Sequence, residues 1–201
     1  KRQRYMFPAE IRVSKKKTVT VEADEGVFPT TAEGLAGLRP VLPNGVHTFG
    51  SQTHPADGNC ALTVTTREKA RELSADPEIE IQVISYGFAR AKKAFMAMAV
   101  VPAAQMALEK AGLSVNDIKA IKTHNPFAAN DIYLADQLGI DVNGFNNYGS
   151  SIVFGHPQAP TAGRTIIEGI EEVVMAGGGY FLFSGCAAGD TGGALVLKIG
   201  K

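Results

Sequence analysis

Three side chains that can transfer protons or stabilise an oxyanion lie in loops of small residues. His156 stands between Gly155 and Pro157, and His124 and Cys186 lie in two further loops that flank it in sequence. An imidazole can donate a hydrogen bond or exchange a proton near neutral pH. A thiol becomes an acid–base group once a neighbour lowers its pKa. Two imidazoles could hold a carbonyl oxygen as it becomes an enolate, while the thiol moves a proton. This set therefore favours chemistry on a thioester.

Each of these residues, taken alone, also has an ordinary structural interpretation. A loop histidine is more often structural than catalytic, and an isolated cysteine is often a small buried hydrophobe. His47 and His54 have no reactive partner at useful spacing, so we interpret both as loop or surface histidines. Cys60 is interpreted as a core residue in the middle of a strand. Only the combination of three reactive loops supports a catalytic interpretation.

The composition argues against several other classes of function. Twenty basic and twenty acidic side chains cancel, so no overall field attracts nucleic acid or an anionic membrane. No apolar run reaches the length of a transmembrane helix, and no signal-peptide pattern is present. The two cysteines give neither a disulfide framework nor metal-ligand spacing. We therefore expect no metal site and a location in the reducing cytoplasm. No glycine-rich phosphate loop is present either.

Strands alternating with helices from residue 59 onward predict an α/β layered domain. Five strands are expected, at residues 59–65, 79–86, 118–123, 180–183 and 194–199. The main helices are expected at residues 66–74, 102–112, about 128–138 and 161–175. Ligands of such sheets gather at strand ends, which is where His124 and Cys186 fall. Residues 1–58 are irregular and form a lead-in segment.

The order of these motifs resembles the C-terminal half of a thiolase. The motifs are HNPF at 124–127, GHP at 155–157, and Cys186 ahead of a glycine-rich strand. Shorter matches frame them: Asp57-Gly58, Lys110-Ala111-Gly112-Leu113, Asp117-Ile118, Phe127-Ala128-Ala129 and Ala162-Gly163-Arg164. The resemblance runs from about Phe7 to the end. It implies that residues 59–201 form a layered α/β thiolase-like C-terminal catalytic domain, a mixed five-stranded sheet with helices on its faces. Residues 1–58 would join this domain to an N-terminal half.

The resemblance also implies catalytic roles for the three reactive residues. His156 would activate the acyl-accepting cysteine and help to hold the thioester oxygen of the second substrate. Cys186 would remove the α-proton from acetyl-CoA or, in the degradative direction, protonate the leaving enolate. His124 opens a box that the family usually writes Asn-Glu-Ala-Phe, and histidine replaces asparagine here as in sterol-carrier-type thiolases. Asn125 stands in place of the acidic residue of that box.

Further positions would support the oxyanions or bind substrate. Gly155 and the backbone N–H of Ala188 would assist the oxyanion holes, although the family usually has glycine at the position of Ala188. Glycines usual after the histidine motif are also replaced, by Ala159 and Ala162. Contacts to the substrate would come from residues near the pantetheine arm and in the acyl pocket, namely Thr53, Met96 and Phe127.

The resulting functional hypothesis is the C-terminal half of a thiolase, which transfers acyl groups between CoA thioesters by thiolysis or Claisen condensation. A coenzyme A thioester would be the substrate, with no covalently bound cofactor. The nucleophilic cysteine would come from an N-terminal half, so the isolated chain should transfer no acyl group. A homodimer or tetramer is expected.

Two alternatives remain open. A ketoacyl-synthase-like condensing enzyme also places two histidines around a cysteine, but decarboxylative condensation needs no base at Cys186. An acyl-CoA-binding relative that has lost catalysis is the other alternative, with Asn125 and Ala188 as signs of that loss.

Overall fold

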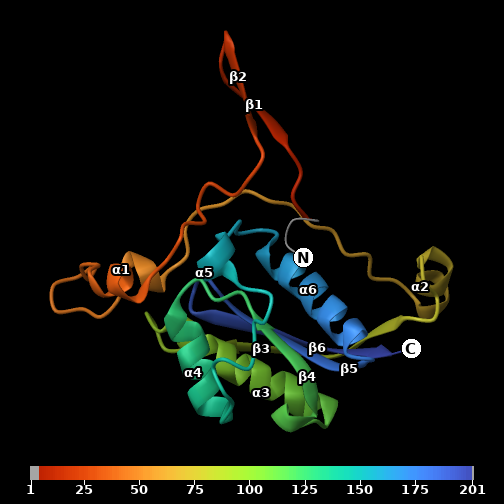
Figure 1. Cartoon of the computed structure of the whole chain (residues 1–201). Helices are drawn as coiled ribbons and strands as arrows, with labels where there is room; N and C mark the ends of the chain where they lie inside the picture. Colours follow the sequence, from red (N-terminus) through yellow and green to blue (C-terminus); the bar gives the residue numbers. More distant parts are fainter. Residues whose placement is uncertain (1–4, 201) are drawn as a thin grey trace.

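A four-stranded mixed sheet forms the centre of the computed structural model, which describes residues 5–200. Its strands are β3 (Glu80–Arg90), β4 (Ile118–Thr123), β5 (Gly179–Ala187) and β6 (Thr191–Gly200). In space they follow the order β3-β6-β5-β4 (Figure 1). β6 is antiparallel to both β3 and β5, whereas β4 runs parallel to β5. The C-terminal part of the chain is thus an α/β unit built on one sheet.

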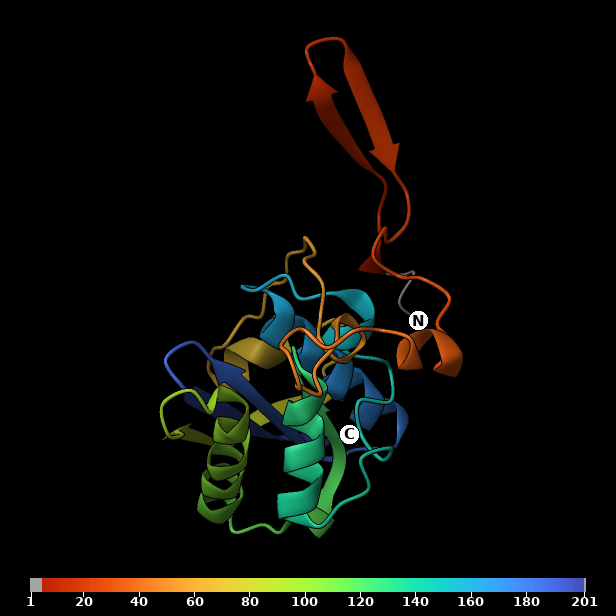
Figure 2. The ribbon, with the colours of Figure 1, turned by 90° about the vertical axis from the view of Figure 1, so that its left-hand side faces the viewer.

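Helices cover both faces of this sheet. Helix α6 (Thr161–Met175) packs on one face, and α3 (Val100–Ala111) packs on the other. Helix α4 (Ala128–Leu138) lies beside α3 (Figure 2). Alternate residues of β5 face opposite sides of the sheet. Phe181 and Phe183 therefore join the core under α6, whereas Leu182 and Cys186 join the core on the side of α3 and α4.

The parallel pairing of β4 with β5 brings two reactive residues, His124 and Cys186, to the same end of the sheet. Thr123 at the end of β4 pairs with Ser184 in β5. His124 follows directly, and its ring lies against the backbone of Gly185, where a Cβ would come within 2.7 Å of the imidazole Nδ1. A side chain at position 185 would therefore displace the histidine.

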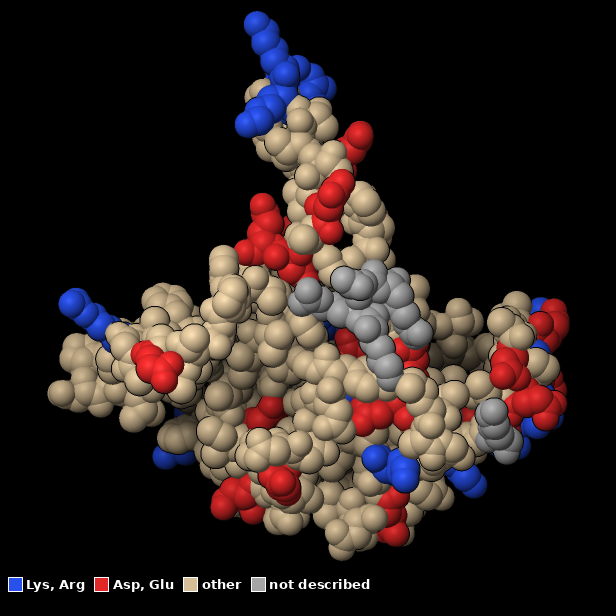
Figure 3. Space-filling view, viewed as in Figure 1, with Lys and Arg blue, Asp and Glu red and all other residues tan. Residues whose placement is uncertain are grey.

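The residues that precede β3 lie largely outside this core. They include a two-stranded antiparallel hairpin, β1 (Ala9–Ser14) with β2 (Lys17–Val21), which projects from the body (Figure 1). Its tip carries exposed basic side chains (Figure 3): Arg12, Lys15, Lys16 and Lys17. Two short helices, α1 (Ala32–Ala36) and α2 (Arg67–Leu73), contain no buried residue. No residue is buried between 5 and 84.

Short helical turns connect the larger elements. They are η2 (Phe49–Ser51), η3 (Met96–Ala99), η4 (Val115–Asp117) and α5 (Ser151–Phe154). Within the described residues, no helix combines the length and apolar character needed to cross a membrane.

The α/β layered fold agrees with the sequence prediction, but the central sheet has four strands rather than five. The expected strand at 59–65 is wrong, because this segment forms no ladder with any described strand. Its apolar side chains Leu62 and Val64 are exposed. Cys60 is half-buried, with its thiol against the carbonyl of Pro160, and so is not the core residue that the sequence suggested. The division of the chain at residue 58 stays a prediction.

Candidate active site

The structure brings together the three reactive residues that the sequence singled out. The rings of His124 and His156 have centroids 5.2 Å apart, with their planes inclined at 58°. Nε2 of His124 lies 3.9 Å from Sγ of Cys186. These residues come from the end of β4, the loop ahead of α6 and the end of β5. Two imidazoles and one thiol thus form a single cluster.

The backbone around His156 is fixed by a close approach of the lead-in segment. Gly155 has φ +83°, a conformation that side chains rarely allow. A Cβ there would lie 2.5 Å from the Cβ of Ala56. The next amide, that of His156, donates to the carbonyl of His54 at 3.0 Å. Gly155 therefore permits the tight packing that holds the histidine loop.

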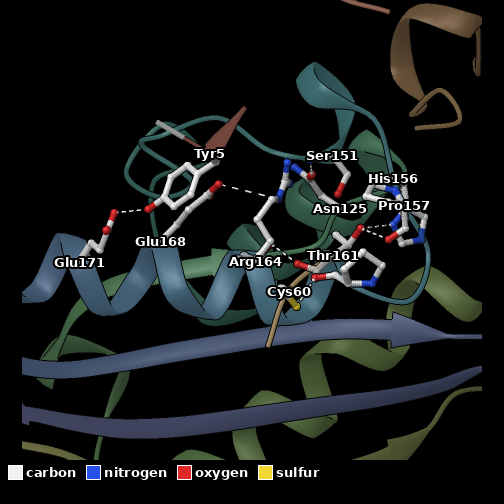
Figure 4. Close-up of polar contacts among 12 residues, drawn as sticks. Tyr5, Cys60, Asn125, Ser151, His156, Pro157, Thr161, Arg164, Glu168 and Glu171 are labelled. Carbon is white, nitrogen blue, oxygen red and sulfur yellow. Dashed lines mark hydrogen bonds and ion pairs between the residues drawn. The ribbon is translucent and has the colours of Figure 1, made fainter. Parts of the chain in front are cut away.

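A hydrogen-bonded chain at the start of α6 orients the His156 ring (Figure 4). The hydroxyl of Thr161 donates to the carbonyl of Pro157 at 2.6 Å. Its oxygen lies 2.8 Å from Nδ1 of His156. A hydroxyl has one proton, so the Thr161 oxygen accepts here and Nδ1 carries the ring proton. Nε2 is left with its lone pair and can accept a proton.

Burial makes all three reactive groups neutral near pH 7. It lowers the pKa of His124 to about 4, assisted by the neighbouring His156. It also lowers the pKa of His156, with a further contribution from the charge of Arg164. Burial raises the pKa of the Cys186 thiol, which a hydrogen bond from Asn130 partly opposes. The cluster can therefore accept protons on imidazole and donate one from sulfur.

Arg164, on α6, lies close to this cluster. Its guanidinium pairs with Glu168 one turn further along α6, at 3.8 Å (Figure 4). It also lies over the ring of Phe154, 5.8 Å from its centroid. The positive charge therefore disfavours a second positive charge on His156.

Asn125 connects the two histidine loops rather than facing the three reactive groups. Its amide oxygen accepts from the backbone N–H of Ser151 at 3.1 Å, and its nitrogen donates to Asp131. Asp131 also accepts from Thr123 at 2.6 Å and from Asn146 at 3.0 Å. Burial raises the pKa of Asp131, and the three hydrogen bonds oppose this. The Asp131 carboxylate therefore holds the His124 loop directly, and through Asn125 it also holds the loop that precedes His156.

The three predicted substrate-binding residues do not line one common cavity. Met96 and Phe127 line an apolar cavity of about 540 Å³ together with His47. The hydroxyl of Thr53 donates to the carbonyl of Ser151 at 2.5 Å. Thr53 thus ties the lead-in segment to the loop that precedes His156.

Ala188 lies in the exposed turn between β5 and β6. Among the described residues of this turn, positive φ angles occur at Gly189 (+82°) and Asp190 (+59°), and not at Ala188. The alanine is therefore placed without backbone strain. Among the residues that the structure describes, no group of three His, Cys, Asp or Glu side chains could hold a metal ion.

Comparison with known proteins agrees with this fold. Residues 78–199 match the family model of the thiolase C-terminal domain. Peroxisomal 3-ketoacyl-CoA thiolase B of Rattus norvegicus is 35% identical over 186 residues, which cover 91% of this chain and 43% of that protein. The chain therefore belongs to the thiolase family, and it spans less than half the length of this curated relative.

Solved structures give the same result. The acetyl-CoA acetyltransferase of Bacillus anthracis superimposes with a TM-score of 0.84 at 30% identity, covering 96% of this chain and 49% of that one. Human mitochondrial 3-ketoacyl-CoA thiolase in complex with CoA superimposes with a TM-score of 0.78 at 28% identity. The match covers 95% of this chain and 47% of the human chain. The fold is that of a thiolase C-terminal region.

Several residues that hold the cluster were missed by the sequence analysis. Asp131 and Asn130 lie in the first turn of α4, where polar residues are ordinary. Thr161 opens α6 and was read only as part of a helix start. The five-residue separation of His156 and Thr161 could have indicated a contact, since both flank one helix terminus. Nothing in the spacing of Asn130 points to Cys186.

Proposed function

We propose that these residues are the C-terminal catalytic half of a thiolase that transfers acyl groups between CoA thioesters. The observation that carries this proposal is the convergence of two neutral imidazoles and a buried thiol, 3.9 Å from the nearer ring. The two histidines come from two different loops and Cys186 from the end of β5, and the parallel pairing of β4 with β5 aligns His124 with Cys186. Family membership supports the same chemistry.

The protonation state of each group suits one step of such a reaction. Nε2 of His156 has a free lone pair, so it accepts the proton of a nucleophilic cysteine supplied by an N-terminal half. That cysteine takes the acyl group, and a CoA thiol leaves. The thiol of Cys186 gives its proton to the departing CoA sulfur, and the resulting Cys186 thiolate then removes the α-proton of acetyl-CoA. The enolate forms a C–C bond with the acyl carbon as the C–S bond to the enzyme breaks.

The reverse direction uses the same groups. In thiolysis the nucleophilic cysteine bonds to the 3-keto carbon, the C–C bond breaks, and the thiol of Cys186 gives its proton to the leaving enolate. An incoming CoA thiol then returns a proton to Cys186 and takes the acyl group as the C–S bond to the enzyme breaks. The raised pKa of Cys186 keeps the thiol protonated at neutral pH, as an acid requires. His124 donates a hydrogen bond to the oxygen that becomes negative, and Nε2 of His156 does so once it carries the proton taken from the nucleophilic cysteine. An imidazole at position 124 does this in place of the family's asparagine, as in sterol-carrier-type thiolases.

The substrate in this proposal is a CoA thioester. The human mitochondrial 3-ketoacyl-CoA thiolase that superimposes on this chain is in complex with CoA. The apolar cavity beside Met96 and Phe127 offers space for an acyl chain or the pantetheine arm. Thr53 lies at the junction of the lead-in segment and the histidine loop, where such an arm would pass.

An N-terminal thiolase half is the proposed partner. The exposed apolar side chains of segment 59–65 and the absence of buried residues from 5 to 84 favour such a covering partner. Assembly into a homodimer or tetramer and a cytoplasmic location belong to the same proposal. Both cysteines are free, as in a reducing compartment.

An acyl-CoA-binding protein without catalysis is the second candidate, and one observation favours it. Asn125 replaces an acidic residue and is used up in contacts to Ser151 and Asp131. A ketoacyl-synthase-like reaction is less suited, because it gives the Cys186 thiol no task.

Cleavage of acetoacetyl-CoA separates these candidates. We expect a protein that carries these residues behind a nucleophile-bearing N-terminal half to convert acetoacetyl-CoA and CoA into acetyl-CoA. The 201-residue chain alone should show no turnover, because it lacks the second reactive cysteine beside a base. Binding of the thioester by the complete protein without any cleavage would favour the non-catalytic candidate.

A further inference from the structure

Asn130 is a fully buried amide in the first turn of α4 that contacts the reactive sulfur. Its side chain is 0% exposed. Its nitrogen lies 3.3 Å from Sγ of Cys186 and 3.4 Å from the carbonyl oxygen of Ala97. Its oxygen accepts from the backbone N–H of Phe127 at 3.3 Å. The three reactive residues of the proposed mechanism do not include it.

Two backbone groups fix which end of this amide faces the sulfur. Phe127 presents an N–H, so it must meet the amide oxygen. Ala97 presents a carbonyl oxygen, so it must meet the amide nitrogen. A flipped amide would place donor against donor and acceptor against acceptor. One N–H of Asn130 is thereby directed at Sγ of Cys186 by the main chain of two other segments.

We propose that Asn130 is a positioning residue that stabilises the thiolate form of Cys186 through this donated hydrogen bond. This role rests on the proposed function of Cys186 as the proton-transfer group. A thiolate accepts a hydrogen bond far more strongly than a thiol does, so a fixed donor favours the charged form. The bond also directs the S–H of the neutral thiol away from Asn130.

The titratable groups near this sulfur are histidines. Nε2 of His124, at the end of β4, lies 3.9 Å from Sγ of Cys186. The ring of His156 lies next to that of His124, with 5.2 Å between the two ring centroids. Burial keeps both neutral near pH 7. Neither imidazole therefore stabilises the thiolate by charge. The side-chain amide of Asn130, together with a backbone hydrogen bond at Cys186, opposes the cost of burial.

The test is the pH profile of Cys186 alkylation by iodoacetamide, measured by mass spectrometry in a Cys60→Ser background. Asn130→Asp keeps the oxygen that accepts from Phe127 and replaces the donor with a negative oxygen. We expect the alkylation midpoint to rise by about one to two pH units, the usual contribution of a hydrogen bond to a charged group. Asn130→Leu removes the donor without adding charge and should raise the midpoint less.

Gln105→Glu is the matched control, because it makes the same amide-to-acid change at an exposed position of α3. Its midpoint should equal that of the background. If Asn130→Asp gives the same midpoint as Gln105→Glu, the proposal is overturned. Alkylation requires no acyl transfer, so this result is independent of whether the complete protein cleaves acetoacetyl-CoA.

A second measurement follows the NMR signals of the Asn130 side-chain amide in the protein without substitution, and variants serve only for assignment and control. The side-chain amide protons of Asn130, assigned by their loss in Asn130→Leu, should move in NMR spectra with the midpoint of Cys186 alkylation. Replacing the thiol by Cys186→Ser should remove that pH dependence. Amide signals that stay fixed while Cys186 titrates would overturn the proposal, even if Asn130→Asp fails to fold.

Discussion

The C-terminal unit and the lead-in segment differ in where their apolar side chains lie. The C-terminal unit begins at residue 78, and the lead-in segment extends in the structure over residues 5–77, because 59–65 forms no strand of the sheet. The C-terminal unit contains both hydrophobic clusters, one under α6 and one under α3 and α4. The lead-in segment has no buried residue, and its large apolar side chains Phe28, Val46 and Val64 are exposed. The first region therefore specifies its own core, whereas the second leaves its large apolar side chains exposed.

The proposed site nevertheless uses both regions. The lead-in segment contributes a hydroxyl from Thr53 and a carbonyl from His54, which hold the loop of His156. The backbone N–H of Thr53 also donates to the carbonyl of Pro126 at 2.8 Å. A segment with little packing of its own thus positions the loops that carry the two histidines.

The largest expected difference between the regions is in stability. Phe181 is fully buried under α6, so Phe181→Ala should lower the free energy of unfolding by about 3–5 kcal/mol. Leu62 in the lead-in segment is 47% exposed, so Leu62→Ala should change it by less than about 1 kcal/mol. Urea denaturation of the chain measures both. Equal losses would show that the lead-in segment packs as tightly as the sheet.

The second expected effect is a pH dependence that originates in the C-terminal unit. His124 has a folded pKa of about 4, below its ordinary value of 6.5. The unfolded chain therefore binds the proton first, and stability is full above pH 6.5 and lost as pH falls towards 4. The loss attributable to His124 should be about 3 kcal/mol.

The measurement is the difference in unfolding free energy between the wild type and His124→Asn at each pH. This difference removes the opposing contributions of Asp131 and Glu168, whose pKa values burial raises. A difference that is constant from pH 7 to pH 4 would show that His124 is not desolvated.

The sequence predicted the C-terminal unit far better than the lead-in segment, for a physical reason. The strand at 118–123 and the helix at 161–175 match the structure residue for residue, because local patterning and packing agree there. The apolar run at 59–65 has the pattern of a strand but finds no neighbour in the described residues. The alternation of apolar residues indicates that one face of a segment is buried. It does not indicate which other segment packs against that face.

The sequence likewise predicted the reactive residues of the site better than the residue that positions one of them. His124, Cys186 and His156 stand out by chemistry and by position at strand or helix ends. Asn130 does not, because its contact with sulfur exists only once α4 folds back beside the end of β5. Such contacts depend on tertiary packing and leave no periodic signal in the chain.

A third effect concerns turnover in the complete protein. His124→Ala should reduce acetoacetyl-CoA cleavage by about 10²-fold or more, since it removes one oxyanion donor. His124→Asn should be tolerated far better, because asparagine retains an N–H donor and is the family's usual residue. Equal turnover in the two variants would show that His124 does not hold an oxyanion.

The smallest effect tests the link between the two regions. Thr53→Val removes the hydroxyl that donates to Ser151, a loss of about 1 kcal/mol that corresponds to about fivefold faster amide exchange. The faster exchange should be confined to residues near 151–156, and protection in β5 should not change. Equally faster amide exchange throughout the sheet would contradict the view that Thr53 acts only on the loop at residues 151–156.

The most direct test of the central claim compares the cysteine of each region in the complete protein. Deuterium exchange at the α-carbon of acetyl-CoA reports the proton transfer assigned to Cys186 and requires no acyl acceptor. Cys60→Ala, in the lead-in segment, should exchange at the wild-type rate. Cys186→Ala should lose about 10²–10⁴-fold, the usual contribution of a general acid–base group. Near wild-type exchange in Cys186→Ala would contradict the account and leave Cys186 as a residue of the core.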